Sequence, residues 1–284
     1  MENGIITINK KLIINYIASK NISDQMQVVI HLNGINFSNS LNRFWKMPID
    51  ELPPIIFLNL PGNDPKIKPY RTNKNYIKLI KKCILNLKQK FQTIKNFYLT
   101  GESWGANLAL LYAKKYPTSI AGIICWNAPS KMNTRLSAKS NAQNLKIGMV
   151  HLLSILFNTN SRCLTGDMKS ITDNEILLRI SNKPGDEKQG FVNLDLAAWY
   201  AMRPSFKYLK KHFKTNNKLP ITYIQTKQDC YYELNIKKIN KFISYANNVN
   251  KIIIQDKGMH LLSLDTNGND KIIWDQMKLM TGVN

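Results

Sequence analysis

Apolar residues gather in short runs along this chain, and stretches with helical spacing lie between several of them. Three continuous apolar runs predict strands buried on both faces, at Gln27–Leu32, Ile55–Leu60 and Ile120–Trp126. Between the last two, Asn73–Lys90 has isoleucines on one side and lysines on the other, which predicts an amphipathic helix. Alternating helices and buried strands are typical of a parallel sheet covered on both faces.

The two ends of the chain add further elements to this sheet. Ile5–Ile8 and Leu12–Ile17 are rich in strand-forming residues and are joined by three polar residues, so we expect a hairpin. Near the other end, strands are expected at Ile221–Gln225 and Lys251–Gln255, and helices at Glu233–Ala246 and Asp270–Met280.

The alternation is interrupted in the middle of the chain. Helical spacing recurs at Leu145–Phe157 and Leu194–Tyr208, but no convincing buried strand accompanies it. We interpret residues 130–217 as a helical cap inserted into one α/β core, formed by residues 1–129 and 218–284.

Composition narrows the possible partners and compartment. The four cysteines among 284 residues are scattered, which argues against a disulfide framework and against a zinc site. This use of cysteine, with no visible secretory signal, predicts a cytoplasmic location. The net charge of +22 comes from 40 basic and 18 acidic residues. The lysines are spread over many predicted helices without interleaved aromatic residues, which argues against binding of nucleic acid. Two explanations of the positive charge remain: a compositional bias of the whole chain, or contact with an anionic membrane.

One stretch carries recognisable chemistry. Phe97–Thr100 predicts a strand and Ala106–Tyr116 a helix, and Gly101-Glu102-Ser103-Trp104-Gly105 joins them. A serine is a weak nucleophile that must be rigidly aimed beside a base, and such a turn aims it through a strained backbone. We therefore predict Ser103 as a nucleophile; the alternative is a serine that only caps the helix.

A general base must accompany this serine. His260 follows the strand predicted at 251–255, at the sheet edge where parallel strands place their sites, so it is the predicted base. The other three histidines fall in a buried strand, an apolar cap helix and a lysine-rich stretch: His31, His151 and His212.

An acid and two oxyanion donors complete the predicted site. Asp229 follows the strand at 221–225 and is the predicted acid, with Glu233 as the alternative, although Glu233 also suits the first turn of the next helix. The backbone N–H groups of Trp104 and Ile35 are the predicted oxyanion donors.

These residues together resemble the α/β-hydrolase superfamily. The resemblance rests on HLNGI, NLPG, GESWGANLALLYAKKYP and the chain order Ser103, Asp229, His260. It implies the α/β-hydrolase fold: a mostly parallel central sheet with an N-terminal hairpin, helices on both faces and an inserted helical cap. TGDMKSITDNEILLRISNKP and GMHLL look like the monoacylglycerol lipase and lysophospholipase branch, whereas SWG with LALLYAKKYP resembles the proline iminopeptidases. The latter typically carry HGGPG where this chain has HLNGIN, so we favour the lipase-like branch.

The resemblance implies hydrolysis of a carboxylic ester through an acyl-enzyme, with no metal or cofactor. A lipid-type ester, such as a monoacylglycerol or lysophospholipid, is the expected substrate. Apolar cap residues, among them Leu153, Phe157 and Trp199, are expected either to line an acyl pocket or to pack the cap on the core. Alternatives are an aminopeptidase of the proline iminopeptidase type, a thioesterase, or a catalytically silent fold used for binding.

Overall fold

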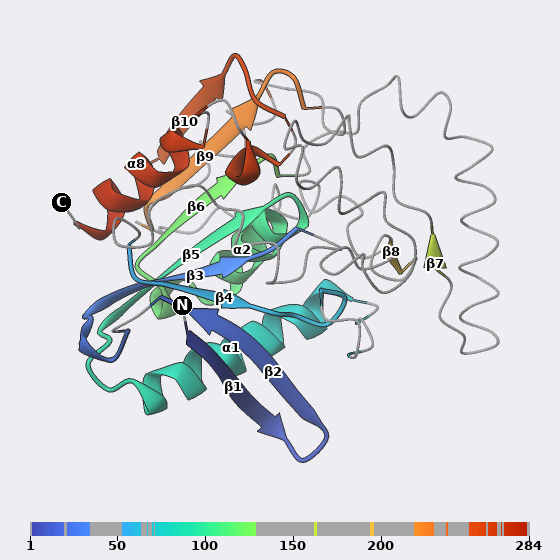
Figure 1. The fold of residues 1–284 in the computed structure, drawn as a ribbon, viewed down its shortest axis with the longest axis vertical. Coiled ribbons are helices and arrows are strands. Elements are labelled where there is room, and N and C mark those ends of the chain that lie inside the picture. Colours follow the sequence, from blue (N-terminus) through green and yellow to red (C-terminus); the bar gives the residue numbers. More distant parts are fainter. Residues whose placement is uncertain are drawn as a thin grey trace.

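The fold follows from a computed structural model of the chain (Figure 1). It describes residues 2–19, 22–34, 53–63, 67, 70, 72–128, 219–229, 237, 251–259, 261–265, 268 and 270–282, and the backbone of 162–163, 194–195 and 250.

An eight-stranded sheet forms the centre of the molecule, in the order β1-β2-β4-β3-β5-β6-β9-β10 (Figure 1). Hairpin strands β1 and β2 are antiparallel to each other, β2 is antiparallel to β4, and every later pair is parallel. The expected mostly parallel sheet with an N-terminal hairpin is therefore confirmed. The strands are β1 (Glu2–Asn9), β2 (Leu12–Ala18), β3 (Gln27–Leu32), β4 (Ile55–Leu58), β5 (Asn96–Glu102), β6 (Gly122–Trp126), β9 (Ile221–Thr226) and β10 (Asn250–Gln255).

Helices cover both faces of this sheet. On one face, α1 (Asn73–Lys90) and α2 (Trp104–Lys115) share an apolar cluster with alternate strand residues such as Ile30 and Leu99. On the other face, α8 (Lys271–Thr281) packs against the intervening residues, such as Val29. The strands are apolar without interruption because both of their faces are buried.

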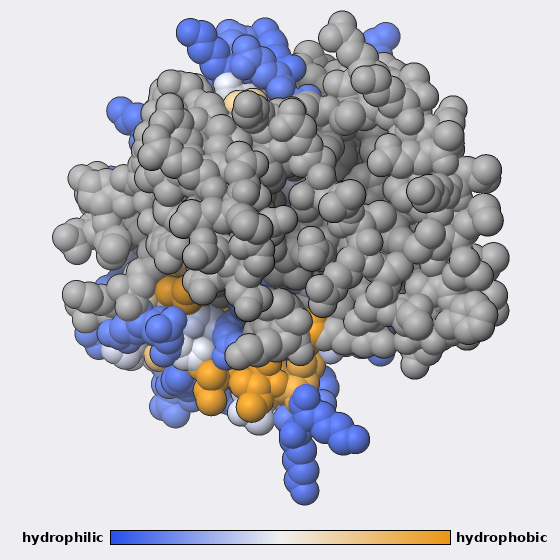
Figure 2. All heavy atoms as spheres, turned by 45° about the vertical axis from the view of Figure 1, so that its right-hand side comes forward, coloured by the Kyte–Doolittle hydropathy of each residue, from blue (hydrophilic) through white to orange (hydrophobic). Residues whose placement is uncertain are grey.

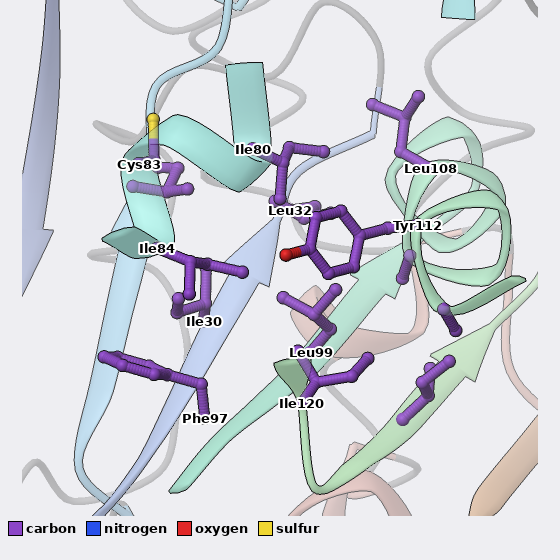
Figure 3. Packing of buried hydrophobic residues seen from close by; sticks show 14 of the residues in the cluster. Ile30, Leu32, Ile80, Cys83, Ile84, Phe97, Leu99, Leu108, Tyr112 and Ile120 are labelled. Carbon is purple, nitrogen blue, oxygen red and sulfur yellow. The ribbon is translucent and has the colours of Figure 1, made fainter. Parts of the chain in front are cut away.

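The packing of α1 and α2 on the sheet is dense (Figure 3). Ile80 and Ile84 of α1 lie over the strands that carry Ile30 and Phe97, and Tyr112 of α2 lies over Leu99 (Figure 3). Thr72 caps α1 by accepting a hydrogen bond from the Asn75 N–H. These contacts give the turn between β5 and α2 a rigid support.

Most predicted elements are found close to their expected ends. Helix α1 and strand β3 have the predicted bounds, whereas β4 ends two residues early, at Leu58. Strand β5 runs through Gly101 and Glu102, two residues beyond the predicted strand, because both pair with neighbouring strands. Three short 3-10 turns complete the described core, at Ile22–Asp24, Pro117–Ser119 and Leu262–Leu264.

One element in the predicted cap differs from expectation. β7 (Arg162–Cys163) and β8 (Leu194–Asp195) form a two-stranded antiparallel sheet, although residues 194 and 195 were expected to begin a helix. This pairing joins residues far apart along the chain, which a local periodicity does not reveal. The rest of residues 130–217, and all of the helix predicted at 233–246 apart from the helical residue Lys237, lie outside the described residues.

Candidate active site

The carboxyl ends of the parallel strands meet at one edge of the sheet. Leu32 of β3 pairs with Gly101, and Glu102 of β5 pairs with Trp126. Backbone hydrogen bonds extend these pairs past the strand ends, from Ser103 N to Trp126 O at 3.1 Å and from Asn127 N to Ile224 O at 3.0 Å. The residues that follow β3, β5, β6 and β9 therefore share the edge where parallel sheets place their sites.

Ser103 occupies the turn between β5 and α2 in a strained conformation. Its φ of 53° and ψ of −118° lie in a region that residues with a side chain rarely adopt. The side chain makes no hydrogen bond to the first turn of α2, so the structure does not support the helix-capping alternative. Only 5 % of Ser103 is exposed, which limits the access of water to its hydroxyl.

Two glycines allow the backbone to pass this tightly. A β-carbon on Gly105 would lie 1.8 Å from the carbonyl oxygen of Leu32. One on Gly101 would lie 2.4 Å from the backbone carbon of Gly105. Both distances are far below a van der Waals contact, so only glycine fits either position. The steric demand of this turn therefore explains why the motif carries glycine at 101 and 105.

Asp229 is buried and held by a short series of side chains. Its Oδ2 accepts a hydrogen bond from Gln225 Nε2 at 3.3 Å. The Tyr223 hydroxyl in turn donates to Gln225 Oε1 at 3.0 Å, which fixes the orientation of the amide. Since Tyr223 and Gln225 are two residues apart on β9, their side chains lie on the same face. Asp229 lies three residues after the end of this strand, and its catalytic role is a proposal.

His260 itself lies outside the described residues, but both chain neighbours are described. Met259 O accepts a hydrogen bond from Asn127 Nδ2 at 3.0 Å. Three residues after His260, Ser263 Oγ donates to Glu102 Oε2 at 2.9 Å. The segment after β10 is thus bonded, on either side of residue 260, to the ends of β5 and β6.

Sequence reasoning missed the contributions of Glu102 and Asn127. Both are buried polar residues at strand ends, and each bonds to the segment that carries His260. A partial signal was present, because Asn127 directly follows a predicted apolar strand and Glu102 lies two residues after another, both at the predicted site edge. The partners of these side chains, however, lie more than 130 residues away in sequence.

The two predicted oxyanion donors differ in how much of their surroundings is described. Trp104 is the first residue of α2, so its backbone N–H belongs to the group that lacks an acceptor within the helix. Its ring packs edge-on against Tyr76, with centroids 4.6 Å apart. Ile35 lies outside the described residues, whereas the Gly34 carbonyl before it accepts a hydrogen bond from Asn63 Nδ2 at 2.6 Å.

His31 is a core residue, as its place in a buried strand predicted. Its ring stacks on Trp126 and meets Phe57 edge-on, and Nδ1 lies 3.0 Å from Thr100 Oγ1. Burial removes solvent from the charged form and lowers the pKa of His31 to about 3, against a smaller opposing effect of its hydrogen bond to Asn33. The imidazole is therefore neutral at physiological pH.

The other predicted site residues lie outside the described part of the chain: Glu233, Leu153, Phe157 and Trp199. Within the described part of the chain, no three His, Cys, Asp or Glu side chains come together as a metal site. No helix in that part is both long and apolar enough to cross a bilayer.

Comparison with solved structures supports the fold. The chain is similar to a soluble variant of monoglyceride lipase from Saccharomyces cerevisiae in complex with a substrate analogue, with a TM-score of 0.73, 15% identity, and coverage of 97% of this chain and 93% of that one. It is also similar to monoacylglycerol lipase from Paleococcus ferrophilus, with a TM-score of 0.72, 12% identity, and coverage of 95% and 98%.

A third similar structure is a thioesterase domain from the curacin biosynthetic pathway, with a TM-score of 0.59, 14% identity, and coverage of 96% and 97%. Among curated proteins, no sequence matches this chain significantly. The family model described as the alpha/beta hydrolase fold matches residues 28–262. With its serine turn, sheet order and this match over most of its length, the chain belongs to the α/β-hydrolase family.

Proposed function

We propose that this protein is a serine hydrolase that cleaves carboxylic esters through Ser103, His260 and Asp229. The observation that carries the proposal is the strained Ser103 at a glycine-lined turn between β5 and α2, in a chain of the α/β-hydrolase family. Asp229 is buried at the end of β9, on the same sheet edge, which supports its role as the acid.

The proposed reaction has two steps. His260 takes the proton from the Ser103 hydroxyl as the oxygen attacks the ester carbonyl, and the carbonyl electrons move onto oxygen. When the tetrahedral intermediate collapses, the ester C–O bond breaks and His260 gives its proton to the leaving alcohol. His260 then deprotonates a water as the water attacks the acyl-enzyme. When this second intermediate collapses, the bond from the acyl carbon to Ser103 Oγ breaks, and His260 returns the proton to Oγ as the acid leaves. Asp229 orients the imidazole and stabilises its charged form.

The oxyanion of both intermediates would be stabilised by the N–H groups of Trp104 and Ile35. The Trp104 N–H stands at the free amino end of α2, where the helix dipole also favours negative charge. The hydrogen bond from Asn63 Nδ2 to Gly34 O holds the backbone directly before Ile35, just past the end of β3, which supports the choice of Ile35.

We favour a lipid-type ester, such as a monoacylglycerol or lysophospholipid, as the substrate. Two of the similar structures are named as a monoglyceride lipase and a monoacylglycerol lipase. The motifs GMHLL and TGDMKSITDNEILLRISNKP in this chain resemble the same branch of the family. Residues 130–217 would form the cap, with Leu153, Phe157 and Trp199 lining the acyl pocket. A thioester is the second candidate, since a thioesterase domain shares the fold.

A substrate panel tests this proposal and separates the alternatives. We expect purified protein to hydrolyse p-nitrophenyl esters and monoacylglycerols, across acyl chains from about two to about sixteen carbons, with a preference for the longer chains. An acyl thioester and a proline arylamide would reveal a thioesterase or an aminopeptidase. A fluorophosphonate probe should label the protein but not Ser103→Ala. If the probe does not label the protein and no substrate of the panel is hydrolysed, the protein is a catalytically silent member of the fold that acts by binding.

We also propose that the protein contacts anionic membranes through the β1–β2 hairpin. Figure 2 shows an apolar area beside hydrophilic side chains at the lower end of the molecule, at the level of this hairpin in Figure 1. Ile5 and Ile13 of the hairpin are 57% and 47% exposed, and Lys10 and Lys11 form its turn. Apolar side chains next to lysines suit the surface of an anionic bilayer.

Vesicle sedimentation tests this contact. Phosphatidylserine vesicles should carry the protein down at low salt, and phosphatidylcholine vesicles should not. Lys10→Glu combined with Ile13→Asp should release it, while Leu85→Asp on α1, another exposed apolar position, should not. Equal sedimentation of both variants would contradict a role of the hairpin.

We propose a cytoplasmic location, which the free, buried thiols of Cys83 and Cys125 support.

A further inference from the structure

Asn127 joins three parts of the sheet edge that are far apart in sequence. It is fully buried directly after β6, and its backbone N–H donates to Ile224 O of β9 at 3.0 Å. Its Oδ1 accepts hydrogen bonds from the backbone N–H of Thr226 at 3.0 Å and from the Thr226 hydroxyl at 3.3 Å. Its Nδ2 donates to Met259 O at 3.0 Å.

The residues bonded to Asn127 lead directly to two proposed catalytic groups. Thr226 ends β9, three residues before Asp229, and Met259 directly precedes His260. One side-chain amide therefore links the segment of the acid to the segment of the base. An amide suits this task because its oxygen only accepts and its nitrogen only donates, so the two bonds cannot exchange.

Asn127 makes these hydrogen bonds from a strained backbone conformation. Its φ of 45° is one of only two positive φ values among the described non-glycine residues, and the other belongs to Ser103. Asparagine tolerates this region better than most residues, yet strain of this kind persists only where surrounding contacts enforce it. The strained backbone aims the Asn127 side chain across β9 toward the segment after β10.

A second contact fixes the same segment on the other side of His260. The Ser263 hydroxyl donates to Glu102 Oε2 at 2.9 Å, and Glu102 directly precedes Ser103. The segment between residues 259 and 263 is thus bonded at both ends to buried side chains, those of Glu102 in β5 and of Asn127 directly after β6. Two fixed points four residues apart restrict how far this short segment can move relative to β5 and the end of β6.

We propose that Asn127 is a positioning residue of the hydrolytic reaction, which sets the base segment relative to the acid segment by bonding Met259 and Thr226 at once. The inference rests on the proposed function, since it assigns Asn127 a role through His260 and Asp229. Asn127 acts on the backbone of these segments and does not touch the reacting atoms.

Asn127→Asp tests the inference because it keeps the acceptor for Thr226 and replaces the donor to Met259 with an oxygen. Aspartate also tolerates the positive φ. Loss of the hydrogen bond to Met259, with a carboxylate oxygen facing its carbonyl instead, predicts a decrease of about tenfold to hundredfold in kcat on a p-nitrophenyl ester and in the labelling rate of Ser103, with KM within about twofold. Asn86→Asp is the matched control, because Asn86 Nδ2 likewise donates to a backbone carbonyl, that of Lys82, on the exposed side of α1.

Hydrogen exchange of residues 256–265 provides a readout that does not depend on catalysis. Amides of this segment should exchange at least about tenfold faster in Asn127→Asp than in the wild type or Asn86→Asp. Asn127→Gly, which loses both side-chain bonds but accepts the positive φ, should show an equal or larger effect and serves if the aspartate variant does not fold.

The outcomes separate the two proposals. If the wild-type serine is not labelled, the proposed function fails, while faster exchange in Asn127→Asp would still support the link between the segments. If labelling and exchange in Asn127→Asp both match the wild type, the positioning role is wrong. It is also wrong if activity falls only in step with the melting temperature while exchange of the segment is unchanged, because that pattern marks general stability alone.

Discussion

Gly105, in the first turn of α2, lies directly against the backbone carbonyl of Leu32 at the end of β3, and a β-carbon there would be 1.8 Å from that oxygen. Neither group is the tip of a flexible side chain, so the helix would have to move off the sheet to make room. Gly105→Ala is therefore expected to lower the free energy of unfolding by about 3 kcal/mol or more. Urea unfolding followed by circular dichroism measures this.

Gly268→Ala provides the contrast, because Gly268 has a φ of 74° but no atom near its missing β-carbon. It should cost only about 1 kcal/mol, from backbone strain alone. Equal losses in the two variants would show that contact with Leu32 is not what requires glycine at 105.

The strain at Ser103 can be measured apart from its chemistry. At φ 53° and ψ −118°, alanine would retain the strain, whereas glycine relieves it. We expect Ser103→Gly to be more stable than Ser103→Ala by about 1 kcal/mol after the greater entropy of the unfolded glycine chain is subtracted. Thermal unfolding of both variants tests this; an alanine variant at least as stable would mean that the turn is unstrained.

Acid should destabilise the protein in part through His31. Its pKa in the folded state is lowered to about 3, because burial disfavours the charged form, while the unfolded chain titrates near the ordinary value of 6.5. Between these values the unfolded chain binds a proton that the folded chain does not. Stability from this group is therefore full above about pH 6.5 and falls as the pH drops, by up to about 1.4 kcal/mol for each unit.

The His31→Gln variant should flatten the dependence of unfolding free energy on pH between about 6 and 4. His212→Gln, in a lysine-rich polar stretch of the sequence, should leave the slope unchanged. A wild-type slope in His31→Gln would show that other groups account for the acid sensitivity.

Asn107 offers a stabilising substitution. It is buried in α2, and neither polar atom of its side chain makes a hydrogen bond to a described residue. A buried amide without partners costs about 1–3 kcal/mol, so Asn107→Leu, which keeps the number and branching of the side-chain heavy atoms, should raise the free energy of unfolding by about 1–2 kcal/mol. Asn86→Leu, at an exposed position of α1, should change it by less than about 0.5 kcal/mol. A less stable Asn107→Leu would instead indicate that a bound water satisfies the amide.

Helix α1 and strand β4 show where prediction from sequence succeeds and where it ends. The bounds of α1 follow from its own residues, namely the apolar spacing and the Thr72 cap, and the sequence predicts them without error. Strand β4 ends at Leu58, which pairs with Leu32 at the end of β3 on one side and with Tyr16 of β2 on the other. The apolar run continues past this point, so the true end depends on neighbours that are distant in sequence.

In the site, too, some features are determined by nearby residues and others by residues distant in sequence. The local pattern of glycines around Ser103, with a strand before and a helix after, determines the turn, because the steric demand arises within a few residues. The placement of Asp229 at a strand end follows from the same kind of local pattern. The roles of Glu102 and Asn127 depend on hydrogen bonds to Ser263 and Met259.

The sequence by itself determined the alternation of strands and helices, the tight turn at Ser103 and the membership of a hydrolase fold, since each is encoded in contiguous residues. Only the tertiary structure decided which strands lie side by side, and therefore that Asn127 meets both Thr226 and Met259. The physical reason is that these hydrogen bonds form across a sheet edge, between groups whose separation along the chain carries no information about their separation in space.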